Sequence, residues 1–167
     1  VLRSVALQAG TKFVYTIASK DVRSALVKDA LHLLTLAGLI VPVKHTSANG
    51  LPLGAEENDN YVKYLFFDLG VMQTMLGNPP SDTLLASEVD FVNKGAASEM
   101  FAGLELLKYH DCFQKAEMHY WQNTAKNALS KVDYLIAKNG KVLPIEVKAS
   151  TQGSMQSLWV FMRKHRI

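Results

Sequence analysis

The chain lacks most features that mark secreted, membrane-spanning or nucleotide-hydrolysing proteins. It has one cysteine, Cys112, which excludes an internal disulfide and suits a reducing compartment, so we expect a cytoplasmic protein. Its apolar stretches are broken well short of the ~20 residues that a membrane-spanning helix needs. No signal-peptide pattern follows Val1. No Gly-x-x-x-x-Gly-Lys-Ser/Thr motif occurs, so we expect no ATP hydrolysis by that route.

The lone cysteine and the histidines near it form no familiar chemical set. Cys112 has no local signature of a catalytic thiol, and we expect a small, buried or half-buried apolar residue there. The spacing of His110, Cys112 and His119 matches no usual zinc-ligand pattern. These residues therefore predict no zinc site.

The overall composition is that of a globular protein with an uneven charge. Of the 167 residues, 49% are hydrophobic and 20% are charged, which suits one domain or two small ones around a sizeable core. The net charge is +3, and residues 131–167 hold seven Lys and Arg against two Asp and Glu. This basic excess suits docking of an anionic polymer, or else it is a solvated positive face.

The N-terminal part has the pattern of a partial winged helix. Residues 22–37 carry apolar side chains at helical spacing, and two predicted strands at residues 39–43 and 61–67 flank a polar loop at residues 44–60. The predicted helix has no net positive charge, so we do not expect it to bind DNA as a recognition helix. A structural linker is at least as good an interpretation.

Further elements follow along the chain. We expect helices over residues 68–76, 81–92, 96–109 and 154–164, and a strand over residues 117–122. Asp68 is expected to cap the first of these helices, and Tyr120 and Trp121 to pack in the core. The expected inward-facing residues of the last two helices are Met100, Phe101, Leu104, Leu107, Met155, Leu158, Trp159 and Met162.

Near the C-terminus the sequence predicts a β-hairpin that carries charged residues. Residues 131–137 and 142–149 are short, apolar and β-branched, and the turn between them contains Asn139-Gly140, the strongest short hairpin signal. If the hairpin registers around this turn, Asp133 lies on the partner strand near Glu146. Because residues two apart share a strand face, Glu146 and Lys148 project together.

This arrangement has a chemical interpretation and a simpler one. Two carboxylates and an ammonium group on one sheet face are what a hard divalent cation and a polarised water require. On the simpler interpretation, Glu146 and Lys148 are an exposed ion pair on a half-solvated strand. Glu99 lies near the start of the helix expected over residues 96–109, where a first-turn acidic charge is favoured by the helix dipole.

An acidic residue on one strand followed by Glu-x-Lys on the next resembles the PD-(D/E)xK restriction-endonuclease-like core. The chain also resembles, from about Val22 to Arg163, the C-terminal region of bacterial and archaeal AAA-type P-loop ATPases. That narrower resemblance is carried by the Lys-Gly-x-x-x-Glu segment ending at Glu99, by Tyr120-Trp121, and by Glu146-Val147-Lys148. In that family a winged-helix region links an ATPase domain to a nuclease-like domain of poorly established function.

The resemblance implies an α/β (α+β) fold, a mixed sheet flanked by helices. It places a partial winged-helix or linker region at residues 1–92 and a restriction-endonuclease-like domain, without its last strand, at residues 93–167. That missing strand and the absent initiator methionine lead us to expect a longer protein, in which an upstream ATPase domain binds ATP. DNA, that ATPase domain and further copies of the chain are the implied partners.

The resemblance also implies roles for individual residues. Asp133, Glu146 and the backbone carbonyl of Val147 would bind Mg²⁺, Lys148 would orient the attacking water, and Glu99 would hold a second metal or a metal-bound water. The implied activity is Mg²⁺-dependent hydrolysis of a DNA phosphodiester. Two alternatives stay open: a nuclease fold that docks nucleic acid or protein without cleavage, and a structural lid or oligomerisation element of the ATPase.

Three departures from the family pattern bear on these alternatives. Lys131 stands where the family usually has Glu, and Gln122 stands where it commonly has Arg. The Gln-x-x-x-Tyr of some nuclease relatives is absent, because Val160 follows Gln156 at that spacing. The first two departures remove no expected metal ligand, but both change the charge around the expected site.

Overall fold

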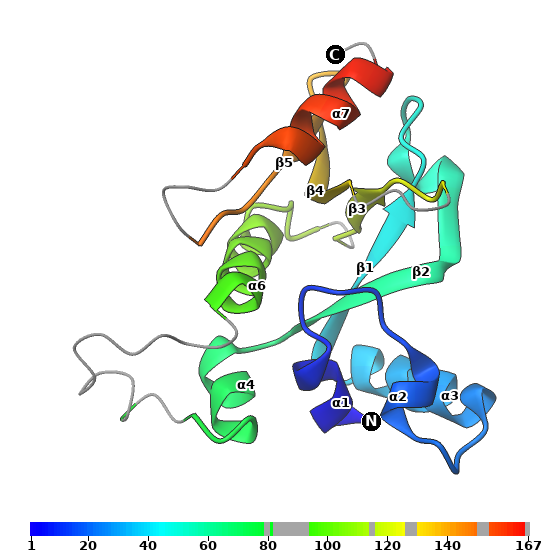
Figure 1. Ribbon diagram of the computed structural model, residues 1–167, viewed down its shortest axis with the longest axis vertical. Coiled ribbons are helices and arrows are strands. Elements are labelled where there is room, and N and C mark those ends of the chain that lie inside the picture. The colour runs from blue at the N-terminus through cyan, green and yellow to red at the C-terminus, as the bar shows by residue number, and fades with distance from the viewer. Residues whose placement is uncertain (79–80, 82–93, 114–115, 126–129, 150–153, 166–167) are drawn as a thin grey trace.

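Five strands form one mixed sheet that is flanked by helices, which confirms the expected α+β fold (Figure 1). The computed structural model describes residues 1–78, 81, 94–113, 116–125, 130–149 and 154–165. The described helices are α1 (Leu2–Leu7), α2 (Tyr15–Ala18), α3 (Ser24–Leu36), the 3-10 helix η1 (Leu53–Glu56), α4 (Leu69–Met75), α6 (Lys94–Lys108) and α7 (Gln156–His165). The strands are β1 (Ile40–Thr46), β2 (Glu57–Phe66), β3 (Met118–Gln122), β4 (Lys131–Lys138) and β5 (Lys141–Ile145).

The sheet has the strand order β2-β1-β3-β4-β5 and crosses the boundary expected between residues 92 and 93. β1 runs parallel to β3, with Val43 opposite Met118, and all other neighbours are antiparallel. The hairpin of the expected winged-helix region therefore shares one sheet with the hairpin that carries Asp133. In Figure 1, α1 to α3 gather at one end of the sheet and α7 lies at the other.

The first hairpin is longer than the sequence pattern predicts. The polar loop expected at residues 44–60 spans only residues 47–56, because both strands extend into it. The extension is held by polar contacts: Lys44 pairs with Glu57 at 2.5 Å, and the buried Thr46 hydroxyl donates to the Leu53 carbonyl at 2.8 Å. A polar run can continue a strand when its side chains find partners, and that is the reason the loop prediction was too long.

The second hairpin has the predicted turn. Asn139 and Gly140 have φ values of 52° and 72°, the left-handed pair that a two-residue type I′ turn requires, and Lys138 pairs with Lys141 across it. β5 ends at Ile145, four residues before the predicted end of the strand. Glu146, Val147 and Lys148 therefore follow the strand rather than lie within it. β5 is also at one end of the strand order, so its outer edge carries no other described strand.

The core confirms some expected packing positions and corrects others. Tyr120 and Trp121 are buried as expected. Phe101 is 56% exposed, because α6 turns Glu99, Met100 and Gly103 toward the sheet instead. Asp68 caps α4 as predicted, by accepting a hydrogen bond from the Val71 amide at 2.8 Å.

The predicted inner face of the last helix was wrong at two positions. Trp159 and Met155 are exposed, and Phe161 is fully buried in their place. The Phe161 ring packs edge-on against Trp121 with centroids 5.2 Å apart, so this contact sets the rotation of α7. Residues two apart on a helix lie on nearly opposite faces, which turns Trp159 outward.

Three further expectations concern Cys112, membrane-spanning helices and the helix over residues 81–92. Cys112 is exposed, so the prediction of a buried or half-buried residue was wrong; it follows the end of α6, outside the packed layers. Among the described helices none is both long and apolar enough to cross a membrane. The helix expected over residues 81–92 lies outside the described residues, apart from Ser81.

Candidate functional site

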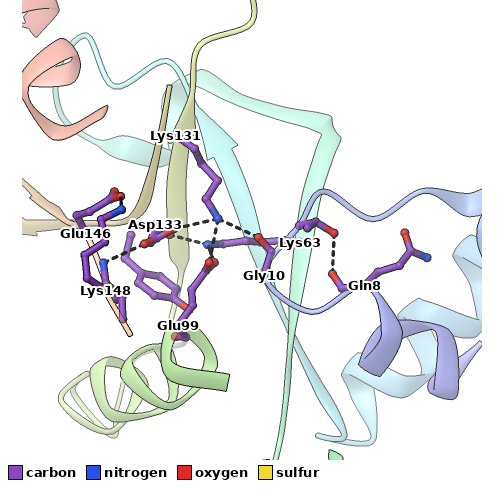
Figure 2. Close-up of polar contacts among 11 residues, drawn as sticks. Gln8, Gly10, Lys63, Glu99, Lys131, Asp133, Glu146 and Lys148 are labelled. Atoms are coloured by element: carbon purple, nitrogen blue, oxygen red, sulfur yellow. Dashed lines mark hydrogen bonds and ion pairs between the residues drawn. The ribbon is translucent and has the colours of Figure 1, made fainter. Parts of the chain in front are cut away.

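Three structural elements bring the predicted acidic residues to one place beside the sheet. Glu99 comes from α6, Asp133 from β4, and Glu146 with Lys148 from the segment after β5 (Figure 2). The position of α6 is fixed by Tyr134, whose hydroxyl donates to the Glu99 backbone carbonyl at 2.7 Å. Gly103 makes this approach possible, because a Cβ there would lie 2.7 Å from the Tyr134 ring carbon Cζ.

Two lysines lie between the carboxylates, and neither was a predicted site residue. The Lys63 ammonium, from β2, donates to Glu99 Oε1 at 2.5 Å and to the Asp133 backbone carbonyl at 2.7 Å. The Lys131 ammonium lies 2.9 Å from both Glu99 Oε2 and Asp133 Oδ1, and it also donates to the Gly10 carbonyl at 2.8 Å. Both oxygens of Glu99 are therefore bound to ammonium groups.

Asp133 is held in its ionised form from both sides. Its Oδ1 contacts Lys131, and its Oδ2 accepts a hydrogen bond from the Val147 backbone amide at 2.9 Å. Burial raises the pKa of this carboxyl, but the Lys131 charge and the Val147 hydrogen bond outweigh burial, so the pKa lies below its usual value. Val147 thus meets Asp133 through its amide, whereas the expected metal contact was through its carbonyl.

Glu146 is the least satisfied of the three acids. Its side chain is 5% exposed, and one oxygen accepts a hydrogen bond from Lys148, as the shared-face prediction requires. The other oxygen, Oε2, is buried and has no hydrogen-bond partner among the described residues. Burial, with the nearby charge of Asp133, raises the pKa of the Glu146 carboxyl. The β4–β5 pairing ends with Tyr134 opposite Ile145, and the charge of Asp133 acts on Glu146, so the two acids lie near each other as predicted.

The two lysines differ in their environment. Lys63 is 1% exposed, and its ammonium also lies 4.4 Å from the centre of the Tyr134 ring. Burial lowers its pKa, against the charge of Glu99. The side chain of Lys131 is 29% exposed; burial lowers its pKa, but Glu99 and Asp133 outweigh this and raise the pKa overall. Lys131 therefore remains charged at neutral pH.

The arrangement is balanced in charge without a metal. Glu99, Asp133 and Glu146 supply three negative charges, and Lys63, Lys131 and Lys148 supply three positive ones. A divalent cation added here would meet a lysine ammonium group on each of the three carboxylates. With Lys131 in this position, the residues do not fit Mg²⁺ between Glu99 and Asp133.

Comparisons with protein families place the two halves of the chain separately. Residues 94–167 match the model of a domain of unknown function, DUF4143, which occurs in proteins associated with AAA ATPases. Residues 1–82 match the model of a second domain of unknown function, DUF8612. Searches of curated proteins and of solved structures gave no match. Residues 94–167 are therefore similar to an ATPase-associated domain of unknown function.

Proposed function

We propose that this chain is the nuclease-like C-terminal region of an AAA-type ATPase, and that it docks nucleic acid without cleaving it. The observation that carries the proposal is the position of Lys131, whose ammonium bridges Glu99 and Asp133 at 2.9 Å from each. An ammonium group there supplies one positive charge permanently, where a nuclease would recruit a divalent ion. The family pattern usually has Glu at this position, so Lys131 reverses the local charge.

The cost of moving Lys131 supports this interpretation. Removing one partner of a buried ion pair costs about 3–5 kcal/mol, because a buried charge is left unpaired. The 29% exposure of Lys131 reduces that figure, but its loss leaves Asp133 with one hydrogen-bonding partner instead of two. Binding of a divalent ion would have to offset the cost of displacing Lys131 as well as the cost of removing water from the ion.

Basic side chains at the far end of the sheet supply a surface for an anionic polymer. Lys138 and Lys141 flank the β4–β5 turn, and Arg163 and Lys164 lie in the last turn of α7, which packs against both strands. All four are exposed. Lys131 and Lys148 are each paired with a carboxylate, so among the described residues after position 130 these four are the basic side chains left to bind phosphate.

A second function is favoured by one observation. Glu146 Oε2 is buried without a partner among the described residues, and such an atom accommodates a cation. A Mg²⁺-dependent nuclease remains the second candidate, in which Lys131 swings toward solvent and Asp133 and Glu146 hold the metal. The two candidates differ in whether DNA is cut.

The test is binding of a fluorescein-labelled DNA duplex, followed by anisotropy with Mg²⁺ present. We expect binding that weakens steeply with salt, with the duplex intact on a denaturing gel. Neutralising Lys138, Lys141 and Arg163 together should reduce the slope of log K against log salt by roughly 0.9 for each phosphate that the protein no longer neutralises. Lys20→Ala, which changes an exposed lysine between α2 and α3, is the matched control.

Each other outcome has a defined meaning. Cut duplex that depends on Asp133 and Glu146 would establish the nuclease and overturn the docking proposal. An equal loss of binding in Lys20→Ala would show that the effect is nonspecific. No binding at any salt concentration would refute nucleic-acid docking and leave a protein partner, such as the ATPase domain, as the ligand of this region.

A further inference from the structure

A second group of ionisable side chains lies on the β1–β2–β3 part of the sheet, formed by other residues than the Glu99 cluster. Glu57 begins β2, Glu117 immediately precedes β3, and His119 lies within β3. One carboxylate oxygen from each glutamate and one imidazole nitrogen all lie within 4.8 Å of one another. Residues 57 and 117 are far apart in the sequence, and it is the pairing of β1 with both β2 and β3 that brings them together.

Each of the three side chains has one potential ligand atom close to those of the other two. His119 is 5% exposed, and its Nε2 lies 2.8 Å from Glu57 Oε1. The second oxygen of Glu57 is held by Lys44 at 2.5 Å, which leaves Oε1 as the atom facing the histidine.

Glu117 has no partner for its carboxylate among the described residues. It forms no hydrogen bond or ion pair with any other residue that the structure describes, although its side chain approaches that of Glu57. Both carboxylates flank Gly54, where a Cβ would lie 3.5 Å from Glu117 Oε2 and 3.7 Å from Glu57 Oε1. The missing side chain at residue 54 leaves room beside these oxygens.

We propose that Glu57, Glu117 and His119 form a site for a divalent transition metal, with Zn²⁺ as the best fit. Zinc binds histidine nitrogen and carboxylate oxygen at about 2.0–2.2 Å, so in a four-coordinate site two ligand atoms lie about 3.3–3.6 Å apart. The three ligand atoms all lie within 4.8 Å of one another, so the most distant pair has to close by up to about 1.5 Å, which rotation of the exposed Glu117 side chain can supply. The imidazole ligand favours zinc over Mg²⁺ or Ca²⁺, which take oxygen ligands.

The surroundings leave one coordination position accessible. Glu117 and His119 line an open cavity of about 940 Å³ whose other walls include Leu51, Gly54, Leu106 and Leu135. Three protein ligands and one position open to a cavity are the arrangement of zinc sites that bind a water or a further ligand. Binding would replace the His119–Glu57 hydrogen bond with metal coordination by the same two atoms, and the proton shared by them would be released to solvent.

Calorimetric titration of the full chain with Zn²⁺ tests the proposal. Cys112 is exposed and its thiol would bind zinc, so all proteins carry Cys112→Ser. We expect one Zn²⁺ per chain in this background. Glu117→Gln should weaken binding at least about tenfold without loss of folding, because Glu117 is exposed. Asp29→Asn, which removes an exposed acid on α3, should leave zinc affinity unchanged.

The contrary results are equally defined. Absence of zinc binding in the Cys112→Ser background would overturn the proposal. Equal zinc affinity in Glu117→Gln would also overturn the proposal, because the ion would then bind elsewhere, for example at the exposed His110. Loss of binding in Glu117→Gln and Asp29→Asn alike would indicate attraction by net charge rather than a built site.

Discussion

Lys63 provides the most stringent test of how the site is held together. Its side chain is 1% exposed and its ammonium binds Glu99 Oε1 at 2.5 Å. Lys63→Met keeps most of the apolar part of the side chain and removes the ammonium group together with its hydrogen bonds to Glu99 and to the Asp133 carbonyl. Breaking a buried ion pair costs about 3–5 kcal/mol. We expect about 3 kcal/mol, the lower end, because Lys131 still pairs with Glu99. For a chain of this size that lowers Tm by roughly 6–12 °C, at about 2–4 °C per kcal/mol.

Lys44→Met is the matched control, measured with Lys63→Met by thermal and urea unfolding. Lys44 also lies on the sheet and pairs with a glutamate at 2.5 Å, but its side chain is 38% exposed. An exposed pair of this kind contributes less than about 1 kcal/mol. The double substitution Lys63→Met with Glu99→Leu removes both buried charges and should be more stable than Lys63→Met alone. Equal effects of Lys63→Met and Lys44→Met would refute the account of a buried, charge-balanced site.

Two further predictions concern the packing of α6 and the pH dependence of stability. Gly103→Ala should destabilise the fold by about 1–3 kcal/mol, because the added Cβ would lie 2.7 Å from Tyr134 Cζ. Gly95→Ala is the control and should not destabilise the fold, because its Cβ would have nothing within 4 Å. Equal unfolding midpoints for the two variants would contradict the contact of α6 with Tyr134. The pKa of the Glu146 carboxyl is raised in the folded state, so the protonated form favours folding and the ionised form opposes it. The destabilisation by the ionised form is absent at acid pH and grows as the pH rises above the pKa of the unfolded state. Glu146→Gln should therefore increase the free energy of unfolding at pH 7 and lose that advantage below about pH 4, near the ordinary glutamate pKa; a loss of stability at pH 7 would contradict the sign.

Local sequence signals were sufficient for the second hairpin and its acids. Asn139-Gly140 determined the turn, and the turn brought Asp133 near Glu146. Both acids could be predicted because the hairpin depends on a turn of a few residues. Glu99 came from the resemblance to the nuclease-like fold and not from a local pattern.

The lysines could not be assigned in the same way. Lys63 was an isolated charge in an otherwise apolar predicted strand, which is the signal that could have revealed a buried partner. Its partner comes from α6, which follows a long segment of the chain, and no local pattern indicates that packing. Lys131 was noted as a departure in charge, but only its distances to Glu99 and Asp133 show that it bridges them.

The same limit applies to the sheet and to the zinc-site proposal. The pairing of β1 with β3 joins residues more than 70 positions apart, so the strand order does not follow from local periodicity. His119 was considered with His110 and Cys112, its neighbours in sequence, and no zinc pattern resulted. Its partners in space are Glu57 and Glu117, which the β1–β3 pairing brings to it.

The most direct test of the central claim is a calorimetric titration with Mn²⁺ of the wild type, Lys131→Ala and Lys138→Ala. Mn²⁺ prefers the same oxygen ligands as Mg²⁺. Lys138 lies at the exposed end of the same strand, so its substitution changes the charge equally without touching the carboxylates. If Lys131 occupies the cation position, only Lys131→Ala should gain metal binding, and Asp133→Asn should abolish the gain. Binding by the wild type that Asp133→Asn removes would contradict the account and restore the metal-dependent nuclease.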